Sequence, residues 1–325
     1  MKEEVLQVLK SCQGFVSGQD LCEYFKVSRT AVWKVIVQLR EEGYEIEAVN
    51  RKGYRLLSSP DILSEAEITS QMTTEVLGHE VCFFDEVDST NNRARMLAEQ
   101  GAPDGTLVIA EHQNGGKGRM GRSFFSPASG GIWMSLILKP DIPPVEASMI
   151  TLIGAVAVAE TMKSYGLEAG IKWPNDVVID KRKVTGILTE MSAGPDKINY
   201  IVVGIGINVN MKSFPEELEQ SAISMAMASG KQYHRAEIIQ RVMKNFEENY
   251  QTFVKRGNLA FLRKEYDENL VHMNKEISIH EIRRVWRGIS RGINDIGDLI
   301  ISTDEGERVV RSGEVSIRGI YGYAE

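Results

Sequence analysis

The sequence is poor in cysteine and contains no long hydrophobic segment. Its three cysteines, Cys12, Cys22 and Cys82, are scattered without the close spacing that zinc sites use. Such an odd and sparse set argues against a disulfide scaffold and indicates a reducing compartment, so we expect the protein in the cytoplasm. The longest nearly uncharged apolar stretch, 147–159, is too short to span a bilayer and predicts a buried helix. Because the N-terminus also lacks the apolar core of a signal peptide, we expect no association with membranes.

The charge balance and the length set further limits. The chain has 325 residues and a formal net charge of −7. This acidic surplus argues against a protein that coats nucleic acid with its whole surface, although a local basic face is compatible with it. At about 150 residues per domain, the length predicts two or three domains with ample core.

The most distinctive segment, 111–127, alternates glycines with basic residues directly after the strand-like run 106–110. Glycine allows the backbone to turn through positive φ and to approach a ligand closely, and the cations attract phosphate or carboxylate oxygens. The segment is not a Walker A loop, because Lys117 is followed by Gly118 where that motif has Ser or Thr. The composition alone also fits a solvated surface loop. The residues concerned are Gly115, Gly116, Lys117, Gly118, Arg119, Gly121 and Arg122.

Three further motifs point to a specific chemistry. Residues 172–176 read Lys-Trp-Pro-Asn-Asp, and Arg182 and Lys183 follow at the start of a predicted strand. Asp-Ser-Thr-Asn at 88–91 opens a predicted helix, and Gly-Ile-Gly-Ile-Asn at 204–208 ends a predicted strand. The last motif is not a dinucleotide fingerprint, because it lacks the third glycine and no helix follows it. In this order and spacing the motifs closely resemble those of the biotin protein ligases, and the resemblance covers nearly the whole chain.

The N-terminal segment has the pattern of a winged helix-turn-helix. Ser17 and Ser28 precede apolar periodic runs, as N-cap residues do. On the helix that Ser28 opens, Val32, Ile36 and Leu39 form a buried stripe with the spacing i, i+4, i+7. Two short strands then predict a β-hairpin, the wing. The predicted elements are helices around 5–9, at 18–25 and from 29 to about 42, and strands at 44–49 and 53–57.

Basic and aromatic side chains off the buried stripe predict a DNA-binding domain over residues 1–60. The expected phosphate contacts are Arg29, Lys34, Arg51 and Lys52, and the expected base contacts are Thr30 and Trp33. With nine basic and eight acidic residues through position 60, one copy should bind DNA weakly, so we expect a dimer on paired half-sites. A small helical interaction domain with a charged face is the alternative.

Residues 61–269 mix helices and strands without the strict alternation of a Rossmann domain, which predicts an α+β domain with a mixed sheet. Ser64 and Glu67 form a capping-box pattern at its first helix. The resemblance implies the class II synthetase-like catalytic domain of the ligases. Residues 270–325 alternate short apolar runs with turn signals and predict a small SH3-like β-barrel. This barrel is either a stabilising cap or, as the resemblance suggests, a part that helps to bind ATP or the acceptor protein.

The resemblance implies a ligase reaction in two steps. The carboxylate of biotin attacks the α-phosphate of ATP and gives biotinyl-5′-adenylate and pyrophosphate. A lysine of the biotin carboxyl carrier protein of acetyl-CoA carboxylase then displaces AMP. Joining two anions requires cations and fixed N–H donors. Mg²⁺ would neutralise oxygens of ATP, and the sequence has no dedicated carboxylate cage for it, as is usual where phosphates hold the metal.

The site residues follow from the motifs that carry the resemblance. Arg119, Lys183 and Asp176 are the expected catalytic residues, with Asp176 orienting or deprotonating the lysine amine. By residue type alone, Asp176 also fits an ordinary turn aspartate and Ser89 an ordinary N-cap. The expected biotin and adenylate contacts are Ser89, Thr90, Asn91, Gln113, Gly116, Lys117, Gly118, Arg119, Arg122, Trp133, Lys183 and Asn208.

The sequence departs from the commonest family pattern at two positions. Lys117 stands where arginine is frequent, and Phe124 stands where tryptophan is frequent. Both replacements keep the charge or the aromatic character, so they affect the details of loop ordering and not the activity. We expect that ordering to bury Met120, Phe124 and Trp133 over the ligand and so to keep water from the adenylate.

The N-terminal domain places the resemblance in the bifunctional bacterial class, which joins the ligase to a biotin operon repressor. It implies that the adenylate acts as corepressor and favours a homodimer, which binds a two-fold operator, while the acceptor protein competes for the same surface. One alternative is a ligase for lipoate or octanoate, but the polar residues at 89–91 and Gln113 favour the ureido ring of biotin. The other is a regulator with an inactive ligand-binding domain, but the intact loop 116–121 and Lys183 favour an enzyme.

Overall fold

The computed structural model describes all residues except 13, 196, 282–283, 313–315 and 320–325. The chain forms two compact units. The first contains residues 1–73 and 234–240, and the second contains residues 74–233 and 241–325. The division into three domains with borders at residues 60 and 269 stays a prediction.

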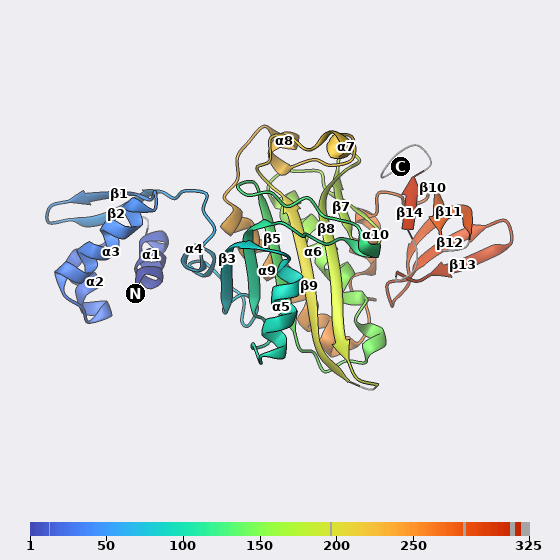
Figure 1. Ribbon diagram of the computed structural model, residues 1–325, viewed down its shortest axis with the longest axis horizontal. Coiled ribbons are helices and arrows are strands. Elements are labelled where there is room, and N and C mark those ends of the chain that lie inside the picture. The colour runs from blue at the N-terminus through green and yellow to red at the C-terminus, as the bar shows by residue number, and fades with distance from the viewer. Residues whose placement is uncertain (13, 196, 282–283, 313–315, 320–325) are drawn as a thin grey trace. The chain divides into compact units, whose positions relative to one another are not determined.

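The first unit contains the predicted winged helix-turn-helix (Figure 1). The hydroxyl of Ser17 accepts a hydrogen bond from the amide of Gln19, and that of Ser28 accepts one from the amide of Ala31, so both serines cap helices as predicted. The elements are α1 (Lys2–Ser11), α2 (Gly18–Phe25), α3 (Arg29–Glu41), β1 (Glu45–Val49), β2 (Gly53–Ser58) and α4 (Glu65–Thr69).

The wing is fixed to the segment before α2. Strands β1 and β2 pair antiparallel, and Val16 exchanges two backbone hydrogen bonds with Tyr54 of β2, at 2.8 and 2.9 Å. Gly53 has a φ of +107°, and a Cβ atom there would overlap the carbonyl of Val16. Glycine is therefore required at the first residue of β2.

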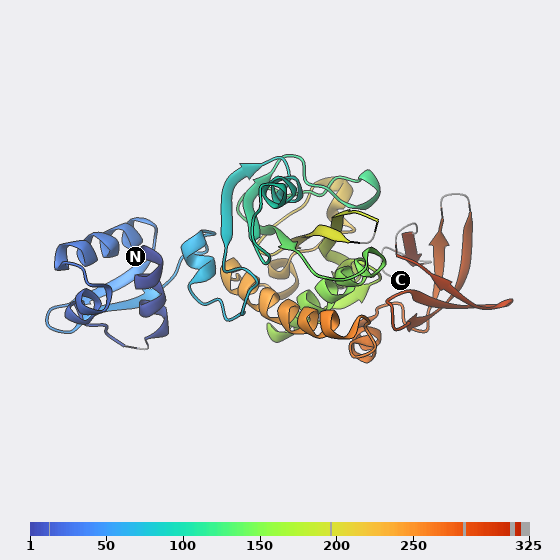
Figure 2. The same cartoon turned by 90° about the horizontal axis from the view of Figure 1, so that it is seen from below.

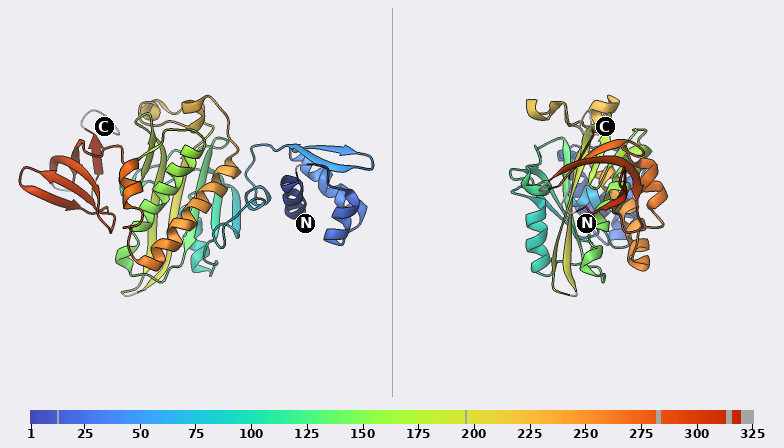
Figure 3. Two further views of the ribbon diagram at one scale, coloured as in Figure 1. Left: turned by 180° about the vertical axis from the view of Figure 1, so that it is seen from behind. Right: turned by 90° about the vertical axis from the view of Figure 1, so that its right-hand side faces the viewer.

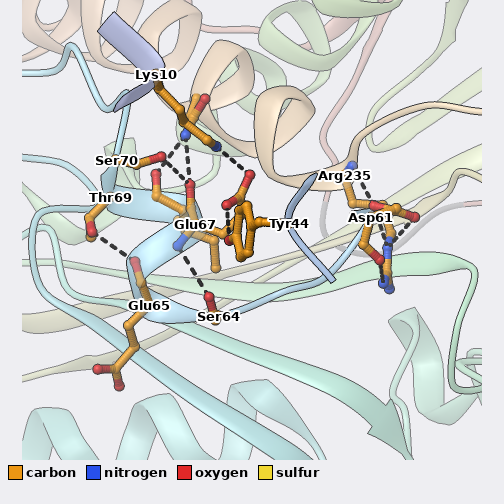
Figure 4. A network of polar contacts seen from close by, with 11 residues as sticks. Lys10, Tyr44, Asp61, Ser64, Glu65, Glu67, Thr69, Ser70 and Arg235 are labelled. Atoms are coloured by element: carbon orange, nitrogen blue, oxygen red, sulfur yellow. Dashed lines mark hydrogen bonds and ion pairs between the residues drawn. The ribbon is translucent and has the colours of Figure 1, made fainter. Parts of the chain in front are cut away.

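Helix α4 is held to this unit by a buried ion pair. The Ser64 hydroxyl accepts a hydrogen bond from the amide of Glu67, which is half of the predicted capping box. The carboxylate of Glu67 does not return to Ser64 but binds the ammonium of Lys10 on α1 and the hydroxyl of Tyr44 at the start of the wing (Figure 4). The side chains of Lys10 and Glu67 are only 8% and 5% exposed. The long-range ion pair therefore replaces the local bond that the pattern predicted.

Helix α4 is also hydrogen-bonded to the beginning of α9 (Arg235–Arg256). The side-chain amide of Gln240 donates to the carbonyls of Glu67 and Ile68, at 3.1 and 2.8 Å. Arg235 forms an ion pair with Asp61, with 3.1 Å between Nε and Oδ2 (Figure 4). These bonds make residues 234–240 part of the first unit.

The second unit is built on a seven-stranded sheet of order β3-β4-β5-β9-β8-β7-β6. Strands β3 and β4 are parallel, and all the other neighbours pair antiparallel, which confirms the predicted mixed sheet. Its strands are β3 (Val81–Val87), β4 (Leu107–Gln113), β5 (Gly131–Leu138), β6 (Gly170–Lys172), β7 (Asp176–Ile179), β8 (Arg182–Ala193) and β9 (Ile198–Asn208).

Helices cover both faces of this sheet. Helix α5 (Thr90–Glu99) lies on one face, and α6 (Met149–Ser164) lies on the other beside the later part of α9 (Figures 2 and 3). Most of the apolar stretch 147–159 is buried in α6 as predicted, although the helix with its preceding turn is long and apolar enough to cross a membrane by composition alone. The shorter helices are η1 (Arg119–Gly121), η2 (Pro144–Glu146), α7 (Glu216–Glu219), α8 (Met225–Ser229) and α10 (Arg263–Asn269).

One contact of α6 gives the stability a pH dependence. The Glu160 carboxyl shares a hydrogen bond with Glu265 on α10. Burial, followed by Glu265 and Glu248, raises the pKa of Glu160 from 4.5 to about 8. The folded chain thus binds this proton more tightly than the unfolded chain, and the resulting stability is lost as the pH rises from about 4.5 through about 8.

We predict that the E160Q variant melts about 2–4 °C higher than the parent at pH 8. The amide keeps a hydrogen-bond donor toward Glu265 without requiring a proton at alkaline pH. Calorimetry at pH 4 and pH 8 measures the difference, and the gain should vanish at the lower pH. An equal shift at both pH values would contradict this explanation.

The C-terminal part of the second unit is a five-stranded antiparallel sheet, which confirms the predicted all-β character. Its order is β13-β12-β11-β10-β14, and the described part ends in β14. The indole N–H of Trp173 donates to the carbonyl of Gly297 at 3.0 Å and so fixes this sheet to the β6–β7 turn. The strands are β10 (Glu276–His280), β11 (Val285–Ile293), β12 (Leu299–Thr303), β13 (Gly306–Val310) and β14 (Ser316–Gly319).

Candidate active site

A cavity opens where the first turn of α5 and the glycine-rich loop meet strands β5, β8 and β9. Nine of the residues predicted to contact biotin or the adenylate line it. The lining residues are Ser89, Thr90, Asn91, Gln113, Lys117, Gly118, Arg119, Phe124, Trp133, Met134, Asn175, Lys183, Gly186, Ile187, Leu188, Gly204, Ile205 and Gly206. The motifs that are separated in the sequence therefore meet in one place.

One end of the cavity is a buried polar network around the start of α5. Gln113 Oε1 accepts hydrogen bonds from the amide and the hydroxyl of Thr90, at 2.8 and 3.1 Å. The hydroxyl of Ser135 bonds Thr90 Oγ1 at 2.8 Å and Asn91 Oδ1 at 2.6 Å, and Asn91 Nδ2 donates to Glu190 at 2.8 Å. These groups are fixed before any ligand arrives, which suits recognition of a small polar ring.

Ser89 stands at the N-cap position of α5, but its side chain makes no capping hydrogen bond. It is buried and lines the cavity. Gln113 takes over the capping role through the amide of Thr90. The serine hydroxyl is thus available for a ligand.

Glycines form the floor of the cavity. A Cβ atom at Gly204 on β9 would overlap Asn91 Oδ1, and one at Gly206 would lie 2.6 Å from the ring of Phe124. At Gly186 on β8 a Cβ atom would lie 2.8 Å from Lys183 Nζ. The depth of the site therefore depends on the absence of side chains at these three positions.

We predict that the G204A variant raises the KM for biotin, the substrate that the family resemblance implies, about 100-fold, because a displacement of Asn91 by the new methyl group misplaces the polar end of the site. Steady-state kinetics measures this change. Gly194→Ala is the control, because a Cβ atom there meets nothing closer than 3.8 Å. Similar KM values for both variants would contradict the role of the glycine floor.

The other end of the cavity carries the two predicted catalytic cations, joined by a chain of hydrogen bonds. Arg119 Nη1 donates to Asn175 Oδ1 at 3.0 Å, and Asn175 Nδ2 donates to Asp176 Oδ1 at 3.1 Å. Lys183 Nζ lies 2.7 Å from the same Asp176 oxygen. The loop, the β6–β7 turn and strand β8 thus place two cations and one carboxylate in a single constellation.

Arg119 is held from a second side. It also donates to the backbone carbonyl of Ser312 in the C-terminal part of the chain. Burial lowers the pKa of Arg119, while the charge of Asp176 opposes that shift. A guanidinium remains protonated in proteins, so it brings a fixed positive charge into a partly dehydrated site.

The glycine-rich loop is an internally bonded hairpin. The amide of Gly118 donates to the carbonyl of Arg122 at 2.7 Å, and Lys117 Nζ donates to Asn92 Oδ1 of α5 at 2.7 Å. Glycine is needed at position 116, where a Cβ atom would overlap the carbonyl of Phe124. Positive φ is confined to Met120 and Gly121 among the described residues of the loop.

The predicted hydrophobic cover is only partly assembled. Trp133 is buried, and Phe124 packs edge to face on it with 5.9 Å between ring centroids. Lys183 Nζ lies 5.6 Å from the centre of the Phe124 ring. Met120 is 61% exposed, so its burial over a ligand stays a prediction.

Some predicted site residues stand outside the cavity. Asp176 lies behind Lys183, and Gly116 shapes the loop. Arg122 is exposed, and the side-chain amide of Asn208 donates a hydrogen bond to the carbonyl of Ile223 at 3.2 Å. Sequence reasoning missed the side chains of Ser135, Asn175 and Glu190, although Asn175 stands inside a quoted motif.

The predicted DNA-contacting residues are all exposed in the first unit. Arg29, Arg51 and Lys52 line one groove between the start of α2 and the wing. Trp33 is 55% exposed on α3, as its position off the buried stripe predicted. Thr30 and Lys34 lie on α3 outside the residues that line the groove.

Comparison with known proteins agrees with this geometry. The model of the Biotin/lipoate A/B protein ligase family matches residues 83–208, an HTH domain model matches residues 2–55, and the Biotin protein ligase C terminal domain model matches residues 272–318. The chain is 42% identical to the Bifunctional ligase/repressor BirA of Bacillus spizizenii, over 93% of this chain and 94% of that protein. Its counterpart from Escherichia coli is 29% identical, over 94% of this chain and 93% of that protein.

A solved structure supports the same relationship. The biotin protein ligase from Aquifex aeolicus in complex with biotin and ATP superposes with a TM-score of 0.66 at 30% identity, and the match covers 74% of this chain and 99% of that chain. Three matching domain models, a nearly full-length relative and a cavity that unites the motifs lead to one conclusion. The chain belongs to the biotin protein ligase family, in its bifunctional ligase and repressor class.

Proposed function

We propose that this chain joins biotin to ATP in the cavity between Arg119 and Lys183 and then transfers biotin to a lysine of a carrier protein. The observation that carries the proposal is the hydrogen-bonded chain from Arg119 through Asn175 and Asp176 to Lys183. A carboxylate and a phosphate repel each other, and two fixed cations at one end of a cavity offset that repulsion.

Each end of the cavity then has a role. The buried network of Thr90, Asn91 and Gln113 receives the ureido ring, with Ser89 as a further hydrogen-bonding group. Lys183 binds the reacting carboxylate and the α-phosphate, and Arg119 stabilises the charge that develops on phosphorus. Once the adenylate has formed, Asp176 orients the amine of the acceptor lysine and accepts its proton.

We propose Mg²⁺ as a companion of the ATP phosphates. Within the described part of the chain, no three His, Cys, Asp or Glu side chains gather in a way that would hold a metal ion. Magnesium usually keeps several waters and binds through substrate phosphates, so it would enter the site with the nucleotide.

The full-length chain with biotin, ATP and Mg²⁺ should release pyrophosphate and then transfer biotin to a biotin carboxyl carrier domain. Chromatography of the adenylate and mass spectrometry of the carrier measure the two steps. Lipoate is the competing substrate, since it lacks the ureido group. Transfer of lipoate in place of biotin would overturn the assignment, and absence of pyrophosphate release would favour a regulator without ligase activity.

We propose that the same chain represses transcription as a DNA-bound homodimer. The groove lined by Arg29, Arg51 and Lys52 supports the DNA contact. The adenylate favours the dimer only if it binds the dimer more tightly than the monomer. Sedimentation with and without biotin and ATP tests this condition, and equal dimer fractions would refute it. DNA and ATP as partners also agree with a cytoplasmic location, which we propose.

Replacing Arg51 by alanine should reduce the dependence of log affinity on log salt concentration by about one, because one phosphate contact is lost. Fluorescence anisotropy with operator DNA across salt concentrations measures the slope. The exposed Lys212 in the second unit provides the control substitution, Lys212→Ala, which should leave the slope unchanged. An unchanged slope for the Arg51 variant would show that Arg51 on the wing does not contact a DNA phosphate.

A further inference from the structure

The side-chain amide of Asn91 lies between two sets of partners with opposite demands. Nδ2 donates to the carboxylate of Glu190 at 2.8 Å and to the carbonyl of Leu188 at 3.3 Å. Oδ1 lies on the other side, 2.6 Å from the hydroxyl of Ser135. A Cβ atom at Gly204, which lines the cavity, would lie 2.2 Å from this oxygen. The end of the amide that faces the cavity is therefore the acceptor end.

The hydroxyls beside the cavity would favour the reverse orientation of this amide. Thr90 gives its hydroxyl proton to Gln113 Oε1, which can only accept. The Ser135 hydroxyl lies 2.8 Å from Thr90 Oγ1 and 2.6 Å from Asn91 Oδ1, so one proton serves two contacts. A reversed Asn91 would donate from Nδ2 to Ser135, and Ser135 would then donate to Thr90. Each of these contacts would have its own proton.

The carboxylate of Glu190 prevents that reversal. A carboxylate only accepts hydrogen bonds, so it requires Nδ2 of Asn91 on its side. Hydrogen bonds to a charged group are roughly twice as strong as neutral ones, so Glu190 prevails over the hydroxyls. The carbonyl of Leu188 is a second acceptor in the same direction. Glu190 thus keeps an acceptor oxygen toward the cavity, although the hydroxyl network remains short of one proton.

Glu190 has this effect from outside the cavity. Among the described residues it does not line the cavity, but it borders a separate hollow together with Arg95, Glu99 and Tyr200. Its side chain is partly exposed, so water reaches the charge. From this position Glu190 acts on a ligand in the cavity through Asn91.

We propose that Glu190 is a positioning residue that selects ligands with ring N–H groups, because it holds Asn91 with the acceptor oxygen toward the cavity. This inference rests on the proposed ligase function and names what the site recognises in biotin. A ureido N–H donates to Asn91 Oδ1 and supplies the proton that the network lacks. The dithiolane ring of lipoate carries no N–H group and leaves this acceptor unpaired, which weakens its binding.

The first test replaces Glu190 by glutamine, which has the same shape but donates as well as accepts. Asn91 is then free to reverse and to turn its NH2 group toward the ligand. We expect the Kd for biotin, measured by calorimetry without ATP, to rise about 10-fold, as one unpaired hydrogen-bonding group predicts. The KM for ATP and the melting temperature should change little.

Glu99→Gln is the matched control for this substitution. Glu99 borders the same hollow as Glu190, but its carboxylate accepts a hydrogen bond from the hydroxyl of Tyr200 at 3.0 Å. E99Q removes the same charge from the same hollow without freeing Asn91. The Kd for biotin should therefore equal that of the parent chain.

A change of ligand separates recognition from packing. Two cyclic carbamate analogues of biotin each carry an oxygen in place of one ureido N–H. One of them should bind the parent chain less well than biotin does, because it sets an oxygen against Asn91 Oδ1. In E190Q this difference should shrink, because a reversed Asn91 donates to that oxygen. A purely structural role of Glu190 would weaken biotin and both analogues by the same factor.

An exchange of the two side chains provides a rescue. In the N91D/E190Q double variant the new carboxylate keeps an acceptor toward the cavity, and the new amide at position 190 donates to it. The double variant should therefore regain most of the biotin affinity that E190Q loses. Calorimetry without ATP measures this recovery as well.

The outcomes are distinct. A parent chain that transfers biotin, together with an E190Q variant that binds biotin equally well, overturns this inference alone. An equal loss for biotin and both analogues, or a double variant that binds no better than E190Q, overturns it as well. A parent chain that neither binds biotin nor releases pyrophosphate overturns the proposed function, and this inference falls with it.

Discussion

Replacing Lys183 by methionine is expected to slow formation of biotinyl-adenylate by about 10²–10³-fold, the range found when one preorganised charge-stabilising donor is removed. Methionine keeps most of the length of the side chain, so the loss reports on charge. The variant also removes the ammonium that lies 2.7 Å from Asp176, so less positive charge remains beside two anionic substrates. Pyrophosphate release in a single turnover measures the rate.

The exposed Lys212 provides the matched control, because the K212M variant removes the same charge outside the cavity. The affinity for biotin in the absence of ATP should fall far less than the rate of the chemical step, because K183M leaves the ureido end of the site intact. A K183M variant within threefold of the parent rate would show that Lys183 does not stabilise the reacting groups.

Replacing Glu67 by alanine is expected to destabilise the first unit by about 3–5 kcal/mol, because the change leaves the ammonium of Lys10 buried without a counter-charge. The hydroxyl of Tyr44 loses its acceptor as well. An effect of this size is a large part of the total stability of a small domain. Calorimetry of the full-length chain should show a transition of the first unit that moves to a much lower temperature.

A surface ion pair of the same unit gives the control. Glu47 and Arg55 pair across the wing at 2.6 Å with both side chains substantially exposed, so E47A should cost at most about 1 kcal/mol. Replacing Lys10 and Glu67 together by methionine and leucine should recover much of the loss. A double variant as unstable as E67A would show that packing, and not the buried charge, accounts for the effect.

The local parts of this fold were predictable from sequence. Ser17 and Ser28 open their helices through bonds to residues two or three positions ahead, which a short window of sequence contains. Most of the apolar stretch 147–159 is buried in α6, as expected of an uncharged run that is too short to span a bilayer. The family motifs also predicted which residues form the site, and the structure brings two of them, Arg119 and Lys183, to one cavity.

The remainder depends on contacts that no local pattern encodes. Ser135 lies in the middle of an apolar strand, and its role comes from Thr90 and Asn91 on a helix packed above it. Asn175 follows a proline in a turn, and its bond to Arg119 exists only after the loop has folded back. Gly204 and Gly206 on β9 leave space for the side chains of Asn91 and Phe124, and no sequence pattern indicates which side chains lie opposite a glycine.

Glu67 shows how a local rule yields to a long-range interaction. The pattern of Ser64 and Glu67 predicted a reciprocal cap, and only the serine half formed. Lys10 offers Glu67 a full charge in a buried setting, whereas the cap offers one uncharged backbone amide. The Glu67 carboxylate therefore pairs with the Lys10 ammonium, the partner with the stronger electrostatic attraction.

The Lys10–Glu67 pair also has a practical consequence for studying DNA binding in isolation. A fragment that stops at residue 60 would contain Lys10 and Tyr44 but not Glu67, which balances the charge of Lys10 and accepts the hydrogen bond of Tyr44. Extending the fragment through α4 would supply this glutamate. Truncation experiments that remove the ligase portion should therefore be cut after helix α4, or a loss of operator binding would report misfolding and not the absence of the corepressor site.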